Sequence, residues 1–183
     1  VWPESLEIRT APAFELRGTQ IGQSGVAREK AKVRTWTQKE MQRAILDYAL
    51  AGLNTLQVSE TNLKENDPLY AFLKSFGIKT LLAYTPNSGA GPPAWQASES
   101  IGRSGYLCPS VPEARKALLK KCEETFRSLA HVDYVRLVGG DGGGCECDRC
   151  RPYGKTFILL CEEMAEIIHA SHPLAQIFIT NQK

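Results

Sequence analysis

The sequence predicts an α/β protein with a parallel β-sheet, arranged as part of a TIM-type (β/α)8 barrel. Five short apolar segments typical of strands alternate with four amphipathic segments typical of helices over 183 residues. The composition is that of a globular domain, with 43% hydrophobic and 23% charged residues. The turn after the first strand lacks the glycine spacing that binds phosphate, which favours a barrel over a doubly wound nucleotide-binding sheet.

The first part of the chain predicts a strand, a helix and a second strand. Residues 14–22 (FELRGTQIG) are expected to form a strand that runs into a glycine-containing loop. Thr37 and Glu40 form a capping-box pattern, in which each side chain binds the free backbone N–H of the other residue at the start of a helix. Gly52 is placed to end that helix, and residues 53–59 (LNTLQVS) follow as the second strand.

A shorter helix and a third strand come next. Asp67 and Pro68 supply an N-cap and a proline for the first turn, and Gly77 ends this helix. Residues 78–84 (IKTLLAY) are the third strand. The loop over residues 85–109 is rich in Gly, Pro and Ser and far exceeds the usual connection of about 4–6 residues, so we expect it to be mobile or functional.

The rest of the chain predicts two longer helices, each followed by a strand. Ser110 and Glu113 form a second capping-box pattern, with Pro112 in the first turn of the helix. This helix leads to the fourth strand, residues 132–138 (VDYVRLV). A helix over residues 155–170 carries its apolar side chains on one stripe, and residues 176–180 form the fifth strand.

We expect a single domain, residues 1–183, that is incomplete at its C-terminus. A TIM barrel needs about 250 residues and eight strands, so about three further βα units would be required. An open doubly wound sheet is the alternative for the same element order. The unpaired edge beside the fifth strand would invite association, either with a second copy of the chain or with the missing C-terminal half of the barrel.

Charge and hydropathy argue against several partners and leave the compartment open. The 22 Lys and Arg residues nearly balance the 20 Asp and Glu residues, and a net charge of +2 provides no broad cationic surface for nucleic acid. Apolar runs are far shorter than the roughly 20 residues that cross a membrane. The first residues, Val1 to Glu4, show no signal peptide, although a processed start would allow a secreted or periplasmic protein.

Candidate site residues follow from the rule that parallel α/β sheets bind ligands at the carboxyl ends of their strands. Asp141 is the strongest catalytic candidate, because it follows the fourth strand among five glycines, which allow close approach of backbone and ligand. Its carboxylate could bind sugar hydroxyls or act as an acid or a base. Glu60, after the second strand, is the other catalytic candidate. The candidate substrate-binding residues are Arg17, Gln20, Tyr84 and Asn181.

These side chains also have structural interpretations. Strand ends are polar wherever they meet water, and Asp141 could bind the backbone of its own turn. The guanidinium of Arg17 suits a carboxylate or paired hydroxyls, but it could instead close the end of the barrel through an ion pair.

The cysteines are the sharpest local signal. Cys145, Cys147 and Cys150 form a C-x-C-x-x-C pattern, and Cys108 lies on the preceding βα loop, which should be adjacent in space. Four thiolates can enclose a tetrahedral structural zinc ion. A disulfide from Cys108 to one of the other three, or unpaired thiols, are the alternatives. No organic cofactor is indicated.

Three segments resemble a known group of carbohydrate-active proteins. Residues 14–22 (FELRGTQIG) resemble the first barrel strand of bacterial alpha-glucuronidases and related proteins of unknown function. Residues 107–115 (LCPSVPEAR) resemble the segment before their third helix, and residues 139–150 (GGDGGGCECDRC) resemble the loop after their fourth strand, which is also similar to the G-G-D-E strand end of beta-hexosaminidases. The resemblance implies a glycoside hydrolase-like (β/α)8 barrel that binds carbohydrate, with Arg17 and Asp141 at sugar-binding positions.

Departures from the hexosaminidase pattern limit this implication. Gly142 replaces the general-acid Glu that follows the Asp, and Gly22 replaces an Asp of the first strand. Glycoside hydrolysis normally uses two carboxyl groups, and Glu60, Glu146 or a carboxylate on later strands could supply the second. Three functions remain open: a glycoside hydrolase-like domain, a non-catalytic carbohydrate-binding or zinc-stabilised structural module, and a phosphosugar-binding enzyme that uses the glycine run as an anion nest. The near-neutral charge argues against the third.

Overall fold

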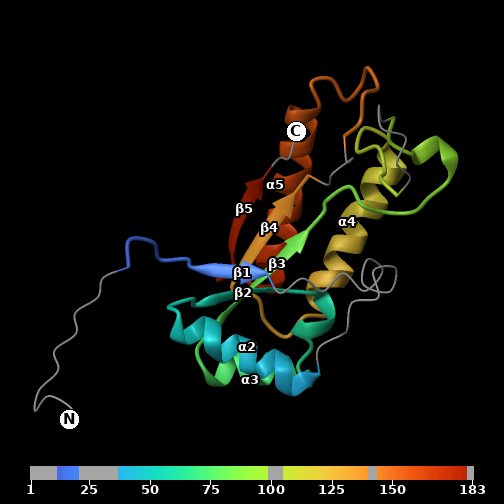
Figure 1. Ribbon diagram of the computed structural model, residues 1–183. Helices are drawn as coiled ribbons and strands as arrows, with labels where there is room; N and C mark the ends of the chain where they lie inside the picture. Colours follow the sequence, from blue (N-terminus) through green and yellow to red (C-terminus); the bar gives the residue numbers. More distant parts are fainter. Residues whose placement is uncertain (1–11, 21–36, 99–104, 140–143, 181–183) are drawn as a thin grey trace, which may run out of the picture.

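Five parallel strands form one sheet in the computed structural model, which describes residues 12–20, 37–98, 105–139 and 144–180 (Figure 1). The strands are β1 (Gly18–Gln20), β2 (Thr55–Val58), β3 (Lys79–Tyr84), β4 (Tyr134–Val138) and β5 (Gln176–Thr180). They lie in the order β1-β2-β3-β4-β5, and every neighbouring pair is parallel. The predicted α/β fold with a parallel sheet is therefore confirmed.

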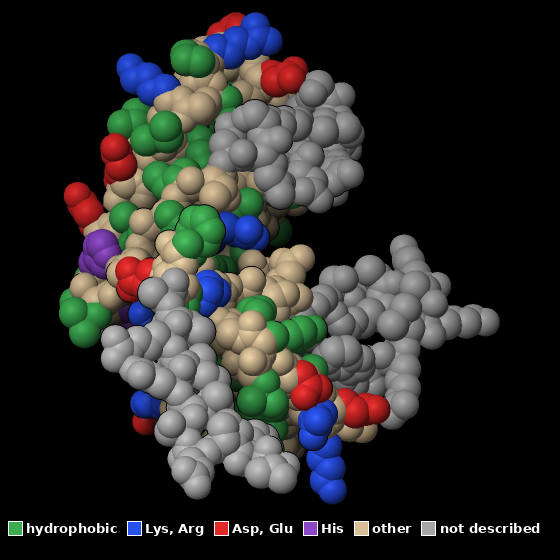
Figure 2. Space-filling model, turned by 60° about the vertical axis from the view of Figure 1, so that its left-hand side comes forward, with side chains coloured by type: hydrophobic (Ala, Val, Ile, Leu, Met, Phe, Trp, Pro, Cys, Tyr) green, Lys and Arg blue, Asp and Glu red, His purple; other side chains and the backbone are tan. Residues whose placement is uncertain are grey.

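Helices connect successive strands. Within the described ranges the α-helices are α2 (Gln38–Leu50), α3 (Pro68–Ser75), α4 (Pro112–Arg127) and α5 (Tyr153–Ser171). Two short 3-10 helices, η1 (Glu60–Leu63) and η2 (Pro93–Trp95), follow β2 and β3. None of the helices in these ranges combines the length and apolar character that a membrane span requires. On the face shown in Figure 2, basic and acidic side chains are interspersed rather than gathered by sign.

All four helices cover the same face of the sheet, as in a barrel. Val58, Leu82 and Val135 occupy matching register positions on three adjacent strands, so their side chains point to one face. Val58 packs against a small core that includes residues of α2 and α3, and the other two belong to the main core with α4 and α5. A doubly wound sheet has helices on both faces and a reversal of strand order, and this sheet has neither.

The main core lies between α4, α5 and the strands beside them. Full burial of one large apolar side chain contributes roughly 1.5–3 kcal/mol, so the two helices hold the sheet mainly through their apolar stripes. Arg115 of α4 also pairs with Glu163 of α5. The side chains of these helices that are at most 1% exposed are Ala114, Leu118, Cys122, Phe126, Phe157, Leu160, Cys161, Met164 and Ile168.

The helix starts predicted for α2 and α3 are confirmed. Thr37 Oγ1 accepts a hydrogen bond from the Glu40 N–H at 3.3 Å, and Glu40 Oε2 accepts one from the Thr37 N–H at 2.8 Å. At α3, Asp67 Oδ1 accepts from the N–H groups of Leu69 and Tyr70 at 2.8 and 3.2 Å. Each helix thus begins where a side chain replaces a missing backbone acceptor.

The capping box predicted at α4 is wrong. This helix begins after Val111, whose side chain forms no capping hydrogen bond. The Ser110 hydroxyl instead reaches the loop between β4 and α5, where it donates to the Arg149 carbonyl at 3.2 Å and lies 3.1 Å from Cys150 Sγ. The Ser110 hydroxyl therefore bonds to a distant loop instead of capping the start of α4.

The first strand is shorter than predicted. β1 covers three residues, whereas residues 14–17 lie outside it and residues 21 and 22 lie outside the described ranges. Asn54 explains its start, because Asn54 Oδ1 accepts from the Arg17 N–H at 3.0 Å and Asn54 Nδ2 donates to the Glu15 carbonyl at 2.8 Å. These side-chain bonds occupy backbone groups that would otherwise extend the strand.

The described parts of the long loop after β3 fold back on themselves. Antiparallel bridges join Ser88 to Tyr106 and Gln96 to Leu107. Gly91 is required where the backbone passes Trp95, because an added Cβ would lie 2.7 Å from the indole ring. The described parts of the loop therefore pack around its own residue Cys108, whose N–H donates to the Trp95 carbonyl at 2.8 Å.

Replacing Asp67 with alanine should lower the free energy of unfolding by about 1 kcal/mol, because two N–H groups at the start of α3 lose their acceptor. Urea denaturation monitored by circular dichroism measures this change. Asp67→Asn keeps an acceptor oxygen and should stay close to wild type. An equal loss in both variants would argue against capping as the source of the stability.

Candidate functional site

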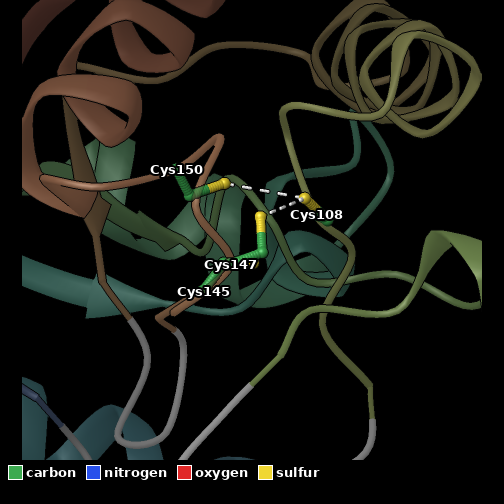
Figure 3. Close-up of side chains that lie close together, drawn as sticks. All are labelled: Cys108, Cys145, Cys147 and Cys150. Carbon is green, nitrogen blue, oxygen red and sulfur yellow. Dashed lines mark hydrogen bonds between the residues drawn. The ribbon is translucent and has the colours of Figure 1, made fainter.

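Four cysteines converge at the carboxyl ends of β3 and β4, as the sequence predicts. Cys108 comes from the loop between β3 and α4, and Cys145, Cys147 and Cys150 come from the loop between β4 and α5. All four sulfur atoms lie within 4.8 Å of one another. Figure 3 shows the side chains of Cys108, Cys147 and Cys150 directed toward a common centre.

The sulfur spacing suits a tetrahedral metal ion. Cys108 Sγ lies 3.6 Å from Cys150 Sγ and 3.8 Å from Cys147 Sγ. Zinc–sulfur bonds of about 2.3 Å place the sulfurs of a tetrahedral site about 3.8 Å apart. A disulfide requires a separation of about 2.05 Å, and all six cysteines of the chain are free thiols in the structure. The sulfur–sulfur distances thus match those of a metal site, and the alternative disulfide is not formed in the structure.

Three of the four cysteines in the cluster are buried. Cys108, Cys145 and Cys150 are at most 3% exposed, whereas Cys147 is partly exposed. A closed set of four sulfur ligands leaves no position for substrate or water. Such a site is structural rather than catalytic when it binds metal.

Hydrogen bonds from two loops hold the sulfurs in place. The Ser98 N–H donates to Cys145 Sγ at 3.4 Å, and the Ser98 carbonyl accepts from the Glu146 N–H at 2.6 Å. The hydroxyl of Ser110 lies 3.1 Å from Cys150 Sγ. The loop after β3 is therefore bonded to the loop after β4 on both sides of the cluster.

Cys108, Cys147 and Cys150 differ in the pKa of their thiols. Burial raises the pKa of Cys108 and of Cys150. Burial acts in the same direction on Cys147, but hydrogen bonds from Cys145, Cys150 and Cys108 outweigh it and lower the pKa of Cys147 to about 7. One thiolate is therefore present near neutral pH, and a metal ion can bind it first and then displace the remaining thiol protons.

Gln20 and Glu60 lie at the carboxyl ends of their strands, as expected. Gln20 is the last residue of β1 and accepts a hydrogen bond at Oε1 from Gln57 Nε2 of β2 at 3.1 Å. Glu60 begins η1 directly after β2 and is exposed. Asp141 and Asn181 lie outside the described residues, so their roles stay predictions.

The expected position of Arg17 is wrong. Arg17 precedes β1, and its guanidinium donates to the carbonyls of Gly52 and Phe14 at 2.8 and 2.6 Å. Gly52 lies between α2 and β2, so Arg17 sits at the amino ends of the strands, where it binds backbone groups. It does not reach the carboxyl ends, where Cys108 and Glu60 lie, because the strand begins after it rather than before it.

Tyr84 ends β3 but points into the main core. Its side chain is 3% exposed, and its ring lies edge-on to Phe126 of α4 with centroids 5.4 Å apart. Burial raises the pKa of its hydroxyl. Side chains alternate between the two faces of a strand, and Tyr84 falls on the helix-covered face. The structure therefore places it away from the side of the sheet where a barrel binds its ligand.

Arg136 was missed by the sequence analysis. It lies within β4 between Val135 and Leu137, which both face the helices, so Arg136 lies on the opposite, inner face of the sheet. Its Nε atom is buried and forms no hydrogen bond with any described residue. A single cation inside an otherwise apolar strand was the available signal.

The histidines bind structural partners away from the cysteines. The Nε2 atoms of His169 and His172 lie 3.0 and 2.8 Å from the carbonyls of Ala175 and Phe126. His131 Nε2 lies 3.3 Å from an Asp133 carboxylate oxygen just before β4. Among the described residues, no histidine lies beside the cluster. A catalytic cysteine is usually activated by an adjacent base, so this arrangement favours a metal site over a cysteine nucleophile.

Solved glycoside hydrolases share this fold. The alpha-galactosidase AgaA of Geobacillus stearothermophilus, a GH36 protein, matches 83% of this chain with a TM-score of 0.53 and 12% identity. The alpha-galactosidase of Lactobacillus brevis matches 80% of this chain with a TM-score of 0.52 and 11% identity. The beta-galactosidase of Bacillus circulans sp. alkalophilus matches 91% of this chain with a TM-score of 0.53 and 14% identity.

The chain spans 27%, 25% and 36% of the lengths of these three proteins. No model of a protein family matches the chain, and a search of curated proteins finds no match. At such low identity the likeness shows the fold alone, and the five strands correspond to part of a TIM-type barrel.

In metal-free protein, the alkylation rate of Cys147 by iodoacetamide should rise through a midpoint near pH 7, because the thiolate is the nucleophile. Cys122 is buried and its pKa is raised to about 12, so it should stay unmodified over the same range. Peptide mass spectrometry at a series of pH values separates the two. A midpoint near 9 for Cys147 would contradict the hydrogen-bonded cluster.

Proposed function

We propose that this chain is a carbohydrate-active domain of the glycoside hydrolase type, which binds a saccharide at the carboxyl ends of its strands. The observation that carries the proposal is the singly wound parallel sheet, shared with proteins described as alpha-galactosidases and a beta-galactosidase. Barrels of this type place their ligands at the carboxyl face of the sheet. The resemblance of three sequence segments to alpha-glucuronidases and beta-hexosaminidases supports the same class of ligand.

The carboxyl groups assigned to catalysis are those of Asp141 and Glu60. One carboxyl would protonate the leaving sugar oxygen, and the other would act as base or nucleophile. Glu60 has the required exposure after β2. Gln20, at the end of β1, would bind sugar hydroxyls through its amide. Arg136, on the inner face of the sheet, would take the ligand-binding role that the sequence assigned to Arg17.

A non-catalytic carbohydrate-binding module is the second candidate. Gly142 occupies the position of the general acid in the beta-hexosaminidase pattern. Five strands also leave an open edge on β5, where Ile179 is 42% exposed. We propose that further strands of a barrel, or a second copy of the chain, cover this edge, and a chain without that cover would bind sugar without hydrolysing it.

We further propose that the four cysteines hold a structural zinc ion. The support is the sulfur separation, the burial of three ligands and the absence of an open ligand position described above. The ion would fasten the loop after β3 to the loop after β4.

Hydrolysis of a panel of nitrophenyl glycosides and uronides tests the catalytic proposal. Asp141→Asn should lower the hydrolysis rate at least 100-fold, because it removes a proton-transferring group. Asp148→Asn is the matched control, since Asp148 is an exposed carboxylate of the same loop. Saccharide binding without hydrolysis in wild type would support the non-catalytic module, and the absence of both would contradict the whole proposal.

Elemental analysis of purified protein tests the metal. We expect about one zinc ion per chain. The ion should be retained in Cys161→Ala and lost in Cys108→Ser, because Cys108 belongs to the cluster and Cys161 does not. Removal of the ion by a chelator should lower the melting temperature, since bound metal stabilises the folded state. Metal-free protein whose thiols become detectable only after reduction would establish a disulfide instead.

A further inference from the structure

The cysteine cluster combines one accessible residue with three buried ones. Cys147 is partly exposed, and its neighbours in the chain on both sides are exposed. Cys108, Cys145 and Cys150 are at most 3% exposed. Oxidation of cysteine follows the accessibility of the sulfur and its thiolate character, and a sulfur that binds a metal ion is a thiolate. An oxidant in solution therefore reaches the cluster first at Cys147.

A second sulfur lies in contact with that of Cys147. Cys108 Sγ is 3.8 Å from Cys147 Sγ, and the two residues come from different loops, 39 positions apart in the chain (Figure 3). A disulfide forms when a thiolate attacks an oxidised sulfur within its reach. Cys108 is therefore placed to attack Cys147 once that residue is oxidised.

Cys150 is the competing partner for an oxidised Cys147. Its N–H donates to the Cys147 carbonyl at 2.9 Å, so both residues belong to one turn. Its sulfur lies 3.1 Å from the Ser110 hydroxyl, and this contact favours its present position. A disulfide within the turn would also leave the loop after β3 unconnected, whereas one from Cys108 joins the two loops.

We infer that the cluster is a redox switch, in which a peroxide oxidises Cys147 and a disulfide between Cys108 and Cys147 replaces the metal ion as the link between the loops after β3 and β4. The inference rests on the proposed structural metal site and adds a form of regulation to it. Once these two sulfurs bond to each other, Cys145 and Cys150 are the remaining ligands. Two sulfurs do not complete the tetrahedral set, so the metal ion is released.

The chemistry is a two-electron oxidation by hydrogen peroxide. The Cys147 thiolate attacks one peroxide oxygen, so an S–O bond forms, the O–O bond breaks and hydroxide leaves. The Cys108 thiolate then attacks the sulfur of the resulting sulfenic acid, which forms the S–S bond, breaks the S–O bond and releases a second hydroxide. Both hydroxides take protons from solvent and become water. A dithiol reverses the process by thiol–disulfide exchange.

The first test treats zinc-loaded full-length chain, kept reduced during purification, with hydrogen peroxide. Zinc release to a chromophoric chelator and the disulfides found by peptide mass spectrometry are measured on the same samples. We expect one zinc ion released for each Cys108–Cys147 disulfide, with the fully buried Cys122 and Cys161 still reduced. A dithiol and fresh zinc should restore the site. A Cys147–Cys150 disulfide, zinc release without a disulfide, or zinc retained in excess peroxide would each overturn the inference.

Two matched variants test the role of Cys108. Cys108→Ser and Cys145→Ser each remove one ligand of the proposed site, but only the first removes the attacking sulfur. After peroxide treatment, dimedone, which labels sulfenic acids, should mark Cys147 in Cys108→Ser. This label should be lost in Cys145→Ser, because Cys108 converts the sulfenic acid into a disulfide. Equal labelling in the two variants would overturn the switch and leave the metal site standing. Wild-type protein that binds no zinc before oxidation would overturn both.

Discussion

The parallel pairing of β3 with β4 is the constraint on which the candidate site depends. Because Leu81 pairs with Tyr134 and Tyr84 with Leu137, both strands end at the same edge of the sheet. The loops that leave them are then neighbours, although Cys108 and Cys145 are far apart in the chain. An antiparallel pairing would have carried one loop to the opposite edge, and the four sulfurs could not have met.

Elements decided by local chemistry were predictable from the sequence. The apolar periodicity of α4 and α5 is set by the residues themselves, and the side chains of Thr37 and Asp67 find their backbone partners within three positions. Ser110 offered the same local signal and failed, because a tertiary acceptor in the loop after β4 competes for its hydroxyl. Sequence distance does not reveal such a competitor.

The cysteine cluster was predictable from the sequence, whereas the positions of the candidate ligand-binding side chains were not. The spacing of the cysteines, together with the rule for adjacent βα loops, sufficed to bring them together. The positions of Arg17 and Tyr84 depended on strand limits and on which face each residue occupies, and an error of one residue reverses the face. Arg136 is distinguished by the surroundings of one atom, its buried Nε, and recognising these surroundings requires coordinates.

The bonding of the two loops around the cysteines has a mechanical consequence. Ser98, Ser110 and the sulfurs join the segment after β3 to the segment after β4, so a displacement of one is transmitted to the other. Near the carboxyl ends of β1 and β2, the described residues include the amide pair Gln20 with Gln57. A change in the length or packing of either loop would therefore reach the sulfur cluster, and through it the other loop.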